Sequence, residues 1–264
     1  MRLSRTVALY FSPTHTTERA VKAFAAGTGL PYEAIDLTTP AQRKGFKRAF
    51  RPDELVVAGF PVYGGLIPKG LEDFFTGLEG RGASAVAVVV YGNRDYDDAL
   101  IELKNRLEER GLKVRAAATF IGQHTISSKI ATGRPDDGDL EIAADFARRT
   151  IASITADGAC LLALKGSYPY VSKGSPPRPG PVTSEACTLC GICVELCPWE
   201  AIDGDDCKTV DSSKCLGCAR CVRECPEGAK SFVRDEAGLA RVADFEKRLT
   251  AKRCEPELFL PQEA

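Results

Sequence analysis

The chain has 264 residues, of which 44% are hydrophobic and 27% are charged, so it can bury a full core and is not a disordered protein. Its 35 basic and 36 acidic side chains give a formal net charge of -1, which excludes a general attraction to nucleic acid or to anionic lipid. No apolar run approaches the length of a membrane span and no signal-peptide pattern opens the chain, so we expect a cytoplasmic protein.

Residues 6–158 alternate between short apolar runs and longer amphipathic stretches, a pattern typical of a parallel sheet covered by helices. We expect strands at 7–11, 33–37, 55–60, 85–91 and 114–121, and helices near 17–26, 69–78, 97–110 and 140–154. This order predicts an α/β domain over 1–158, built on a doubly wound, five-stranded parallel sheet. Ligands of such sheets bind beyond the carboxyl ends of the strands, which makes the loops after the first, third and fourth strands the candidate site.

The loop after the first strand is rich in hydroxyl groups, contributed by Ser12, Thr14, Thr16 and Thr17. Hydroxyls and backbone N–H groups at the start of a helix form an anion site. Because no lysine follows at the spacing of a nucleotide P-loop, we expect a phosphate held by neutral donors. A simple helix cap formed by the same hydroxyls is the alternative.

The loops after the third and fourth strands combine glycine with aromatic side chains. The first loop contains Pro61, Val62, Tyr63, Gly64 and Gly65, and the second contains Gly92, Asn93 and Tyr96. Glycine permits backbone conformations closed to other residues, and tyrosine offers a flat face. One polar loop and two aromatic loops suit a phosphate tail and a planar ring. Interfacial packing is the alternative role for each tyrosine.

The remainder of the chain divides into a linker, a cysteine module and a tail. Residues 159–181 lose the periodicity and become rich in Gly, Pro and Ser, which predicts an extended linker. Residues 182–236 hold most of the cysteines and more acidic than basic side chains. Over 239–252, apolar residues recur at helical spacing, so we expect 237–264 to form a helical C-terminal tail that docks on another part of the protein.

Eight of the eleven cysteines form two runs of identical C-x2-C-x2-C-x3-C-P spacing. This spacing is typical of proteins with two 4Fe-4S clusters, in which the last cysteine of each run ligates the other cluster. We therefore expect one cluster on Cys187, Cys190, Cys193 and Cys225, and a second on Cys215, Cys218, Cys221 and Cys197. A zinc site is the alternative, but zinc has no use for the third cysteine or the trailing Cys-Pro. Cys160, Cys207 and Cys254 fall outside the pattern and receive no role.

Two other segments invite interpretation. The basic stretch Arg43, Lys44, Lys47, Arg48 and Arg51 indicates either a solvated helix face or a docking surface for an acidic partner or the acidic cysteine module. The segment with His124, Ser127, Ser128 and Lys129 after the fifth strand does not by linear proximity make a hydrolase site, and we expect a structural or cluster-facing loop.

The cysteine module resembles a bacterial two-cluster ferredoxin, and the three loops resemble those of flavodoxin, in which the first holds the FMN phosphate and the next two flank the isoalloxazine. The resemblance implies that Ser12, Thr14 and Thr17 contact the phosphate, and that His15 stands where flavodoxins have glycine. It also implies that Gly64 or Gly65 presents backbone groups to flavin N5. Tyr63 or Tyr96 would stack on the ring.

Across nearly its whole length, the chain is similar to the ferredoxin-fused flavodoxins of anaerobic microbes. This resemblance implies an electron-transfer protein that couples FMN to two 4Fe-4S clusters and exchanges electrons with redox partner proteins. A flavin-dependent reductase of a small substrate is the alternative, with Tyr96, His15 and His124 as candidate proton donors. In a third interpretation, the protein is a sensor or scaffold whose clusters only stabilise the fold.

Overall fold

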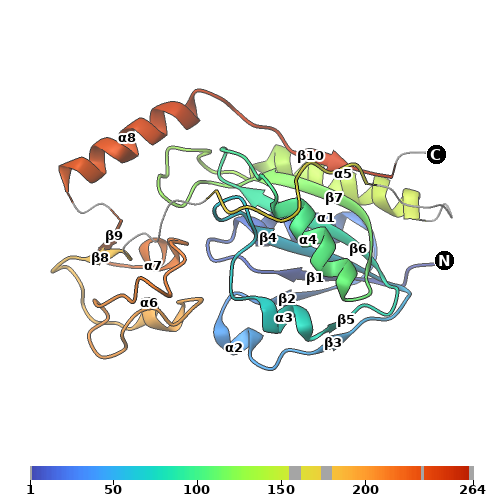
Figure 1. The fold of residues 1–264 in the computed structure, drawn as a ribbon, viewed down its shortest axis with the longest axis horizontal. Helices are drawn as coiled ribbons and strands as arrows, with labels where there is room; N and C mark the ends of the chain where they lie inside the picture. Colours follow the sequence, from blue (N-terminus) through green and yellow to red (C-terminus); the bar gives the residue numbers. More distant parts are fainter. Residues whose placement is uncertain (1, 155–161, 174–179, 233–234, 262–264) are drawn as a thin grey trace.

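The computed structural model describes residues 2–154, 162–173, 180–232 and 235–261. Five parallel strands form the main sheet, in the spatial order β2-β1-β4-β6-β7 (Figure 1). Their bounds are β1 (Arg5–Tyr10), β2 (Tyr32–Asp36), β4 (Glu54–Pro61), β6 (Ser84–Tyr91) and β7 (Lys113–Ile121). Counted along the chain, this order is 2-1-3-4-5, which is the strand order of the flavodoxin-like doubly wound fold. The expected α/β fold class is confirmed.

The sheet has six strands rather than the expected five, because the C-terminal segment adds one. β10 (Glu257–Phe259) pairs antiparallel with β7 and places Leu258 opposite Ala118. Within the described part of the expected helical tail (237–261), the helix is α8 (Glu236–Thr250), and the chain then continues to the strand β10. A strand of three residues carries too little alternation to be recognised from sequence, and its pairing with β7 decides its conformation.

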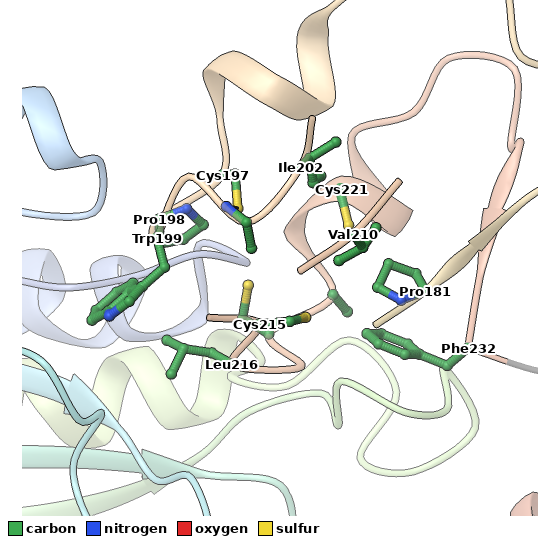
Figure 2. A pocket seen from close by; sticks show the side chains of 13 residues that line it. Pro181, Cys197, Pro198, Trp199, Ile202, Val210, Cys215, Leu216, Cys221 and Phe232 are labelled. Atoms are coloured by element: carbon green, nitrogen blue, oxygen red, sulfur yellow. Dashed lines mark hydrogen bonds between the residues drawn. The ribbon is translucent and has the colours of Figure 1, made fainter. Parts of the chain in front are cut away.

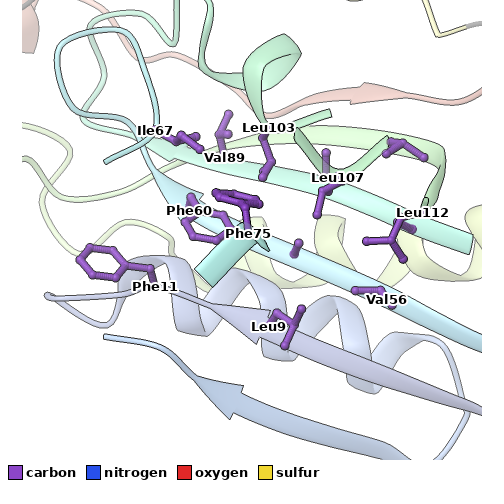
Figure 3. Close-up of a cluster of buried hydrophobic side chains, with 14 of the residues drawn as sticks. Leu9, Phe11, Val56, Phe60, Ile67, Phe75, Val89, Leu103, Leu107 and Leu112 are labelled. Carbon is purple, nitrogen blue, oxygen red and sulfur yellow. The ribbon is translucent and has the colours of Figure 1, made fainter. Parts of the chain in front are cut away.

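Helices cover both faces of the sheet (Figure 1). α1 (Thr16–Gly27) and α5 (Asp137–Ile154) bury Phe24 and Phe146 against one face. On the other face, α4 (Ala99–Glu109) and α3 (Glu72–Thr76) pack on an apolar cluster that includes Phe60, Phe75 and Leu103 (Figure 3). The central strands β4 and β6 are buried from end to end, which explains their nearly continuous apolar sequences.

The expected helix at 69–78 is reduced to the five residues of α3. Gly70, just before the helix, has a φ of +78°, which favours glycine. Gly77 caps the other end, where a Cβ would lie 2.1 Å from Phe46 O. Three further short elements belong to the main domain: α2 (Pro40–Arg43), and the strands β3 (Arg48–Ala49) and β5 (Leu78–Glu79), which pair with each other.

The cysteine module is built from two similar halves. α6 (Ile192–Glu195) lies within the first cysteine run and contains Cys193, and α7 (Arg220–Arg223) lies within the second and contains Cys221. β8 (Val182–Thr183) pairs antiparallel with β9 (Lys230–Ser231). Gly191 and Ala219 precede the two helices at equivalent positions, and both adopt a left-handed backbone, with φ of 79° and 64°. The sequence repeat is thus a structural repeat.

The described part of the expected linker lies against the main domain rather than spanning open space. The Asp98 carboxylate accepts hydrogen bonds from the backbone N–H groups of Ser167 and Val171, at 3.0 and 3.2 Å. Further on, the backbone N–H of Lys173 donates to Gly64 O at 2.8 Å. Cys160 and residues 174–179 of this linker lie outside the described residues. In the part of the chain that the structure describes, none of the helices combines the length and apolar character needed to cross a membrane.

Candidate functional site

One cavity in the cysteine module is lined by Cys197, Cys215, Cys218 and Cys221, which we call the inner set. Its other walls are apolar, with Ile202, Val210 and Phe232 around the thiols (Figure 2). Backbone N–H groups donate to two of the sulfurs: Ala201 N to Cys197 Sγ at 3.3 Å and Gly217 N to Cys215 Sγ at 3.4 Å. The four cysteines expected to hold the second cluster are therefore brought together around one space.

A second cavity is lined by Cys187, Cys190, Cys193 and Cys225, the outer set. Ala229 N donates to Cys225 Sγ at 3.3 Å and so repeats the contact of Ala201 with Cys197. Each cavity takes its last cysteine from the other run, as the sequence predicts. Cys207, to which we gave no role, and Lys230 also line this cavity.

The chemistry of both cysteine sets fits iron–sulfur clusters. Burial raises the pKa of the Cys218 and Cys221 thiols to about 12, so without a bound cation these groups stay protonated at neutral pH. A coordinated metal deprotonates such thiols and supplies the missing positive charge. Among the described residues, no group of three or more His, Cys, Asp or Glu side chains is arranged to hold a single metal ion. A four-iron cube instead takes each thiolate at a different iron, around a space.

In the loop after β1, one hydroxyl serves as a helix cap and another is left over. Ser12 Oγ accepts from the N–H of Glu18 at 3.0 Å, and Ser12 N–H donates to Thr38 Oγ1 at 2.9 Å. Thr14 and Thr16 are half-buried, whereas Thr17 is fully buried. Within the described residues, the Thr17 Oγ1 atom has no hydrogen-bond partner. An orphaned hydroxyl at the N-terminus of a 12-residue helix fits an anionic group such as a flavin phosphate.

His15 occupies a backbone position that favours glycine, because its φ is 62°. Its imidazole is about half exposed and lies between two carboxylates, with Nδ1 2.8 Å from Glu18 and Nε2 3.5 Å from Glu224. Glu224 belongs to the cysteine module. The residue that departs from the flavodoxin pattern thus contacts the module.

The loop after β4 contains Tyr63 and two glycines, and it faces the inner set electrostatically through Tyr63. Gly64 and Gly65 have φ of 64° and 85°, and a Cβ at Gly65 would lie 2.8 Å from Asp97 Oδ2, so the turn requires glycine. Tyr63 is half-buried in the adjacent position. Burial raises the pKa of its phenol, Cys218 raises it further, and Arg223 lowers it. The phenol therefore lies within electrostatic range of a cysteine of the inner set.

In the loop after β6, two of the expected flavin residues contact the C-terminal segment. The Asn93 amide donates to Leu249 O at 2.7 Å and Lys252 O at 2.8 Å, and its oxygen accepts from Cys254 N at 3.0 Å. The Tyr96 hydroxyl donates to Glu257 at 2.8 Å, and its ring is 1% exposed beneath Lys165. Gly92 lies against His124, where a Cβ would be 2.4 Å from the ring.

The cysteine module sits at the carboxyl edge of the sheet (Figure 1). Trp199 packs edge-on against Phe11, with 5.2 Å between ring centroids, and the Arg43 guanidinium lies 4.4 Å above the Trp199 ring. The Arg223 guanidinium donates to the carbonyl oxygens of Gln123 and His124. Of the basic stretch, Arg43 therefore contacts the module, whereas Arg48 and Arg51 pair with acids of the main domain.

The segment after β7, for which we expected a structural or cluster-facing role, contacts α8. Ser127 Oγ donates to Glu246 at 2.6 Å, and Lys129 Nζ lies 3.0 Å from the same carboxylate. His124 packs edge-on against Phe245, with 5.0 Å between ring centroids. These contacts fasten α8 to the main domain.

Residues 186–229 match a family model described as a 4Fe-4S dicluster domain. A selenate reductase component from Mesobacillus selenatarsenatis is 35% identical to the chain over 71 residues, which are 25% of this chain and 22% of that protein. The chain thus spans about a fifth of the length of the curated relative that it matches.

Solved structures similar to the main domain include two flavodoxins. One, from the domain Archaea, is 13% identical with a TM-score of 0.40, over 58% of this chain and 99% of its own. Flavodoxin 2 from Bacillus cereus is 16% identical with a TM-score of 0.39, over 56% and 98% of the two chains. Because these scores are low, the assignment rests on the strand order. The chain joins a flavodoxin-like α/β domain to a C-terminal 4Fe-4S dicluster ferredoxin domain.

Proposed function

We propose that the chain is an electron-transfer protein in which FMN at the carboxyl edge of the sheet and two 4Fe-4S clusters exchange electrons. The observation that carries this proposal is the position of the inner cavity. Its Cys218 lies within electrostatic range of the phenol of Tyr63, in the loop that would flank the flavin. Trp199 and Leu216, which line the same cavity, pack against the core of the main domain. Flavin and inner cluster would therefore be neighbours.

The residues that would hold the flavin come from two loops. The N-terminus of α1 and the buried Thr17 hydroxyl would bind the phosphate, together with Thr14. The left-handed turn at Gly64 and Gly65 would bring backbone groups to the edge of the ring. When bound, the flavin exchanges one or two electrons and each cluster exchanges one, so the chain would link two-electron and one-electron carriers.

The two clusters would have different roles in electron transfer: the inner one would face the flavin, and the outer one would face the protein surface. The inner set is walled by apolar side chains, which exclude water. In the outer set, Cys190 is exposed, and the neighbouring side chains of Leu189 and Ile192 are 55% and 36% exposed. We infer that redox partner proteins exchange electrons with the outer cluster at this surface.

The positions of the candidate proton donors support an electron carrier over a substrate reductase. The Tyr96 hydroxyl is committed to Glu257, and the His15 imidazole lies between two carboxylates. His124 packs against Phe245. Of these three side chains, all within the described residues, Tyr96 and His124 are held in packing contacts, and the half-exposed His15 already pairs with acidic groups.

Two ligand variants test the proposal. Cys218→Ala removes an inner ligand and Cys190→Ala an outer one, and we expect both to keep bound FMN and to lose electron transfer from reduced flavin to cytochrome c, used as a one-electron acceptor. Cys254→Ala is the control, because Cys254 belongs to neither set. Unchanged cytochrome c reduction by both ligand variants would refute the proposal.

A further inference from the structure

The repeat within the cysteine module places a lysine where its other half has isoleucine. Ile202 follows Cys197 by five residues, and Lys230 follows Cys225 by the same interval. The residues just before them, Ala201 and Ala229, make the same N–H to Sγ hydrogen bond at 3.3 Å. Both side chains are buried, with exposed fractions of 6% for Ile202 and 3% for Lys230. The two halves therefore provide an internal comparison.

The two residues line different cavities. Ile202 lies beside the inner set, with its side chain near Cys197 and Cys221 (Figure 2). Lys230 lines the cavity of the outer set. The equivalent position is thus apolar beside one set of thiols and cationic beside the other.

Lys230 is a buried cation whose protein contacts are neutral. Its ammonium donates to Thr183 Oγ1 at 2.8 Å and to Cys207 O at 2.7 Å. Among the described residues, no carboxylate forms an ion pair with it. Asp206, which feels its charge, is exposed and accepts hydrogen bonds from Thr209 and Lys208 N. A buried charge without a counter-charge is costly. An ammonium has three donor positions, of which the described residues accept from two.

The cavity that Lys230 lines is where an anionic group would balance this charge. A four-iron cluster with its four thiolates carries net negative charge and becomes more negative by one unit on reduction. A nearby cation therefore stabilises the reduced state more than the oxidised state and raises the reduction potential. Burial raises the pKa of the Cys193 thiol, and the charge of Lys230 opposes that rise, which agrees with this geometry.

We propose that Lys230 is the counter-ion of the outer cluster and holds its reduction potential above that of the inner cluster. This inference rests on the proposed function. One electron then passes downhill from the inner cluster, which is oxidised, to the outer cluster, which is reduced. Electrons accumulate at the outer cluster, whose ligand Cys190 is exposed, and a partner protein can accept them there. The charge of Lys230 also lowers the pKa of Cys221 of the inner set, but Lys230 lines the outer cavity and not the inner one, so we expect its larger effect on the outer cluster.

Anaerobic redox titration monitored by electron paramagnetic resonance tests this role. In the unaltered chain we expect two separate cluster potentials. Lys230→Met keeps an apolar side chain like that of Ile202, and we expect it to shift the reduction equilibrium of the higher-potential cluster about tenfold toward the oxidised state, which is about 59 mV. The reduction potential of the other cluster should shift less, so the difference between the two cluster potentials becomes smaller. Lys230→Arg, which keeps the charge, should keep the gap.

The control variant is Lys214→Met, which removes an exposed cation next to Cys215 of the inner set. We expect Lys214→Met to leave both cluster potentials nearly unchanged, because water screens an exposed charge. Equal potentials in the unaltered chain, or an unmoved gap in Lys230→Met with full iron and sulfide content, would overturn the role of Lys230 alone. If Lys230→Met loses its clusters, an unmoved gap in Lys230→Gln overturns it equally. Absence of clusters from the unaltered chain would overturn the proposed function as well.

Discussion

At the scale of single residues, His15 shows what a departure from a family pattern means physically. Flavodoxins have glycine at this position, and here the backbone has a φ of 62°, which glycine adopts without strain. The imidazole instead contacts Glu18 and, across the domain boundary, Glu224. We infer that His15 tolerates a strained backbone because its side chain contacts Glu224 of the cysteine module, which single-domain flavodoxins lack.

Thr17 gives the sharpest residue-level prediction. Its buried Oγ1 has no partner within the described residues, so in Thr17→Val we expect the flavin-free chain to be more stable by about 1 kcal/mol. The same change removes a donor to the phosphate, so FMN affinity should fall about tenfold. Urea unfolding of the flavin-free protein and fluorescence titration with FMN measure the two effects. Thr17→Ser keeps the hydroxyl and serves as control, and unaltered affinity in Thr17→Val would remove Thr17 from the phosphate site.

The cysteine sets were predictable from sequence, whereas the roles of Asn93 and Tyr96 were not. Cysteine spacing is local, and each run supplies three thiols from one short turn. By contrast, Asn93 meets Leu249 and Tyr96 meets Glu257 over more than 150 residues of intervening chain. A Gly-Asn pair after a parallel strand looks the same whether it contacts a flavin or a returning tail.

At the scale of elements, the main domain was predictable because its strands are buried. β4 and β6 are apolar throughout, so their sequences stand out from the amphipathic helices between them. β10 did not stand out, because three residues set no period and its partner β7 is far away in the chain. The tail was therefore expected to be helical only, although it also completes the sheet.

The return of the tail depends on Asn93, whose three hydrogen bonds hold Leu249, Lys252 and Cys254. We expect Asn93→Ala to lower the free energy of unfolding by about 3 kcal/mol, since it leaves one buried and two partly buried backbone groups without their partner. Proteolysis after α8 should become faster, and FMN affinity should stay the same. Asn105→Ala, which removes one hydrogen bond to Tyr170, should cost about 1 kcal/mol. A large loss of FMN affinity in Asn93→Ala would place Asn93 in the flavin site after all.

At the scale of the whole molecule, the two domains share one junction at the carboxyl edge of the sheet. Phe11, Arg43 and Trp199 form an aromatic and cationic contact, and Arg223 binds two carbonyl oxygens of the loop after β7. The junction therefore sets the separation of flavin and inner cluster.

Arg43 tests the junction without altering a cluster ligand. Arg43→Ala removes its contact with the Trp199 ring and its hydrogen bond to Pro198 O, and should weaken docking by about 2 kcal/mol. We expect faster proteolytic separation of the domains and slower electron transfer from flavin to clusters, with unchanged iron and flavin content. Lys44→Ala, at an exposed neighbouring position, should change neither the rate of proteolytic separation nor the rate of electron transfer. Equal transfer rates in Arg43→Ala and the unaltered chain would show that this contact does not position the centres.

The central claim is that one chain holds a flavin and two four-iron clusters. Anaerobic purification followed by quantification of iron, acid-labile sulfide and extracted flavin tests it most directly. We predict about eight iron, about eight sulfide and about one FMN per chain. Eight iron without FMN, even after reconstitution with FMN, would contradict the account of the flavodoxin-like domain, and about four iron or fewer after cluster reconstitution would contradict the two cysteine sets.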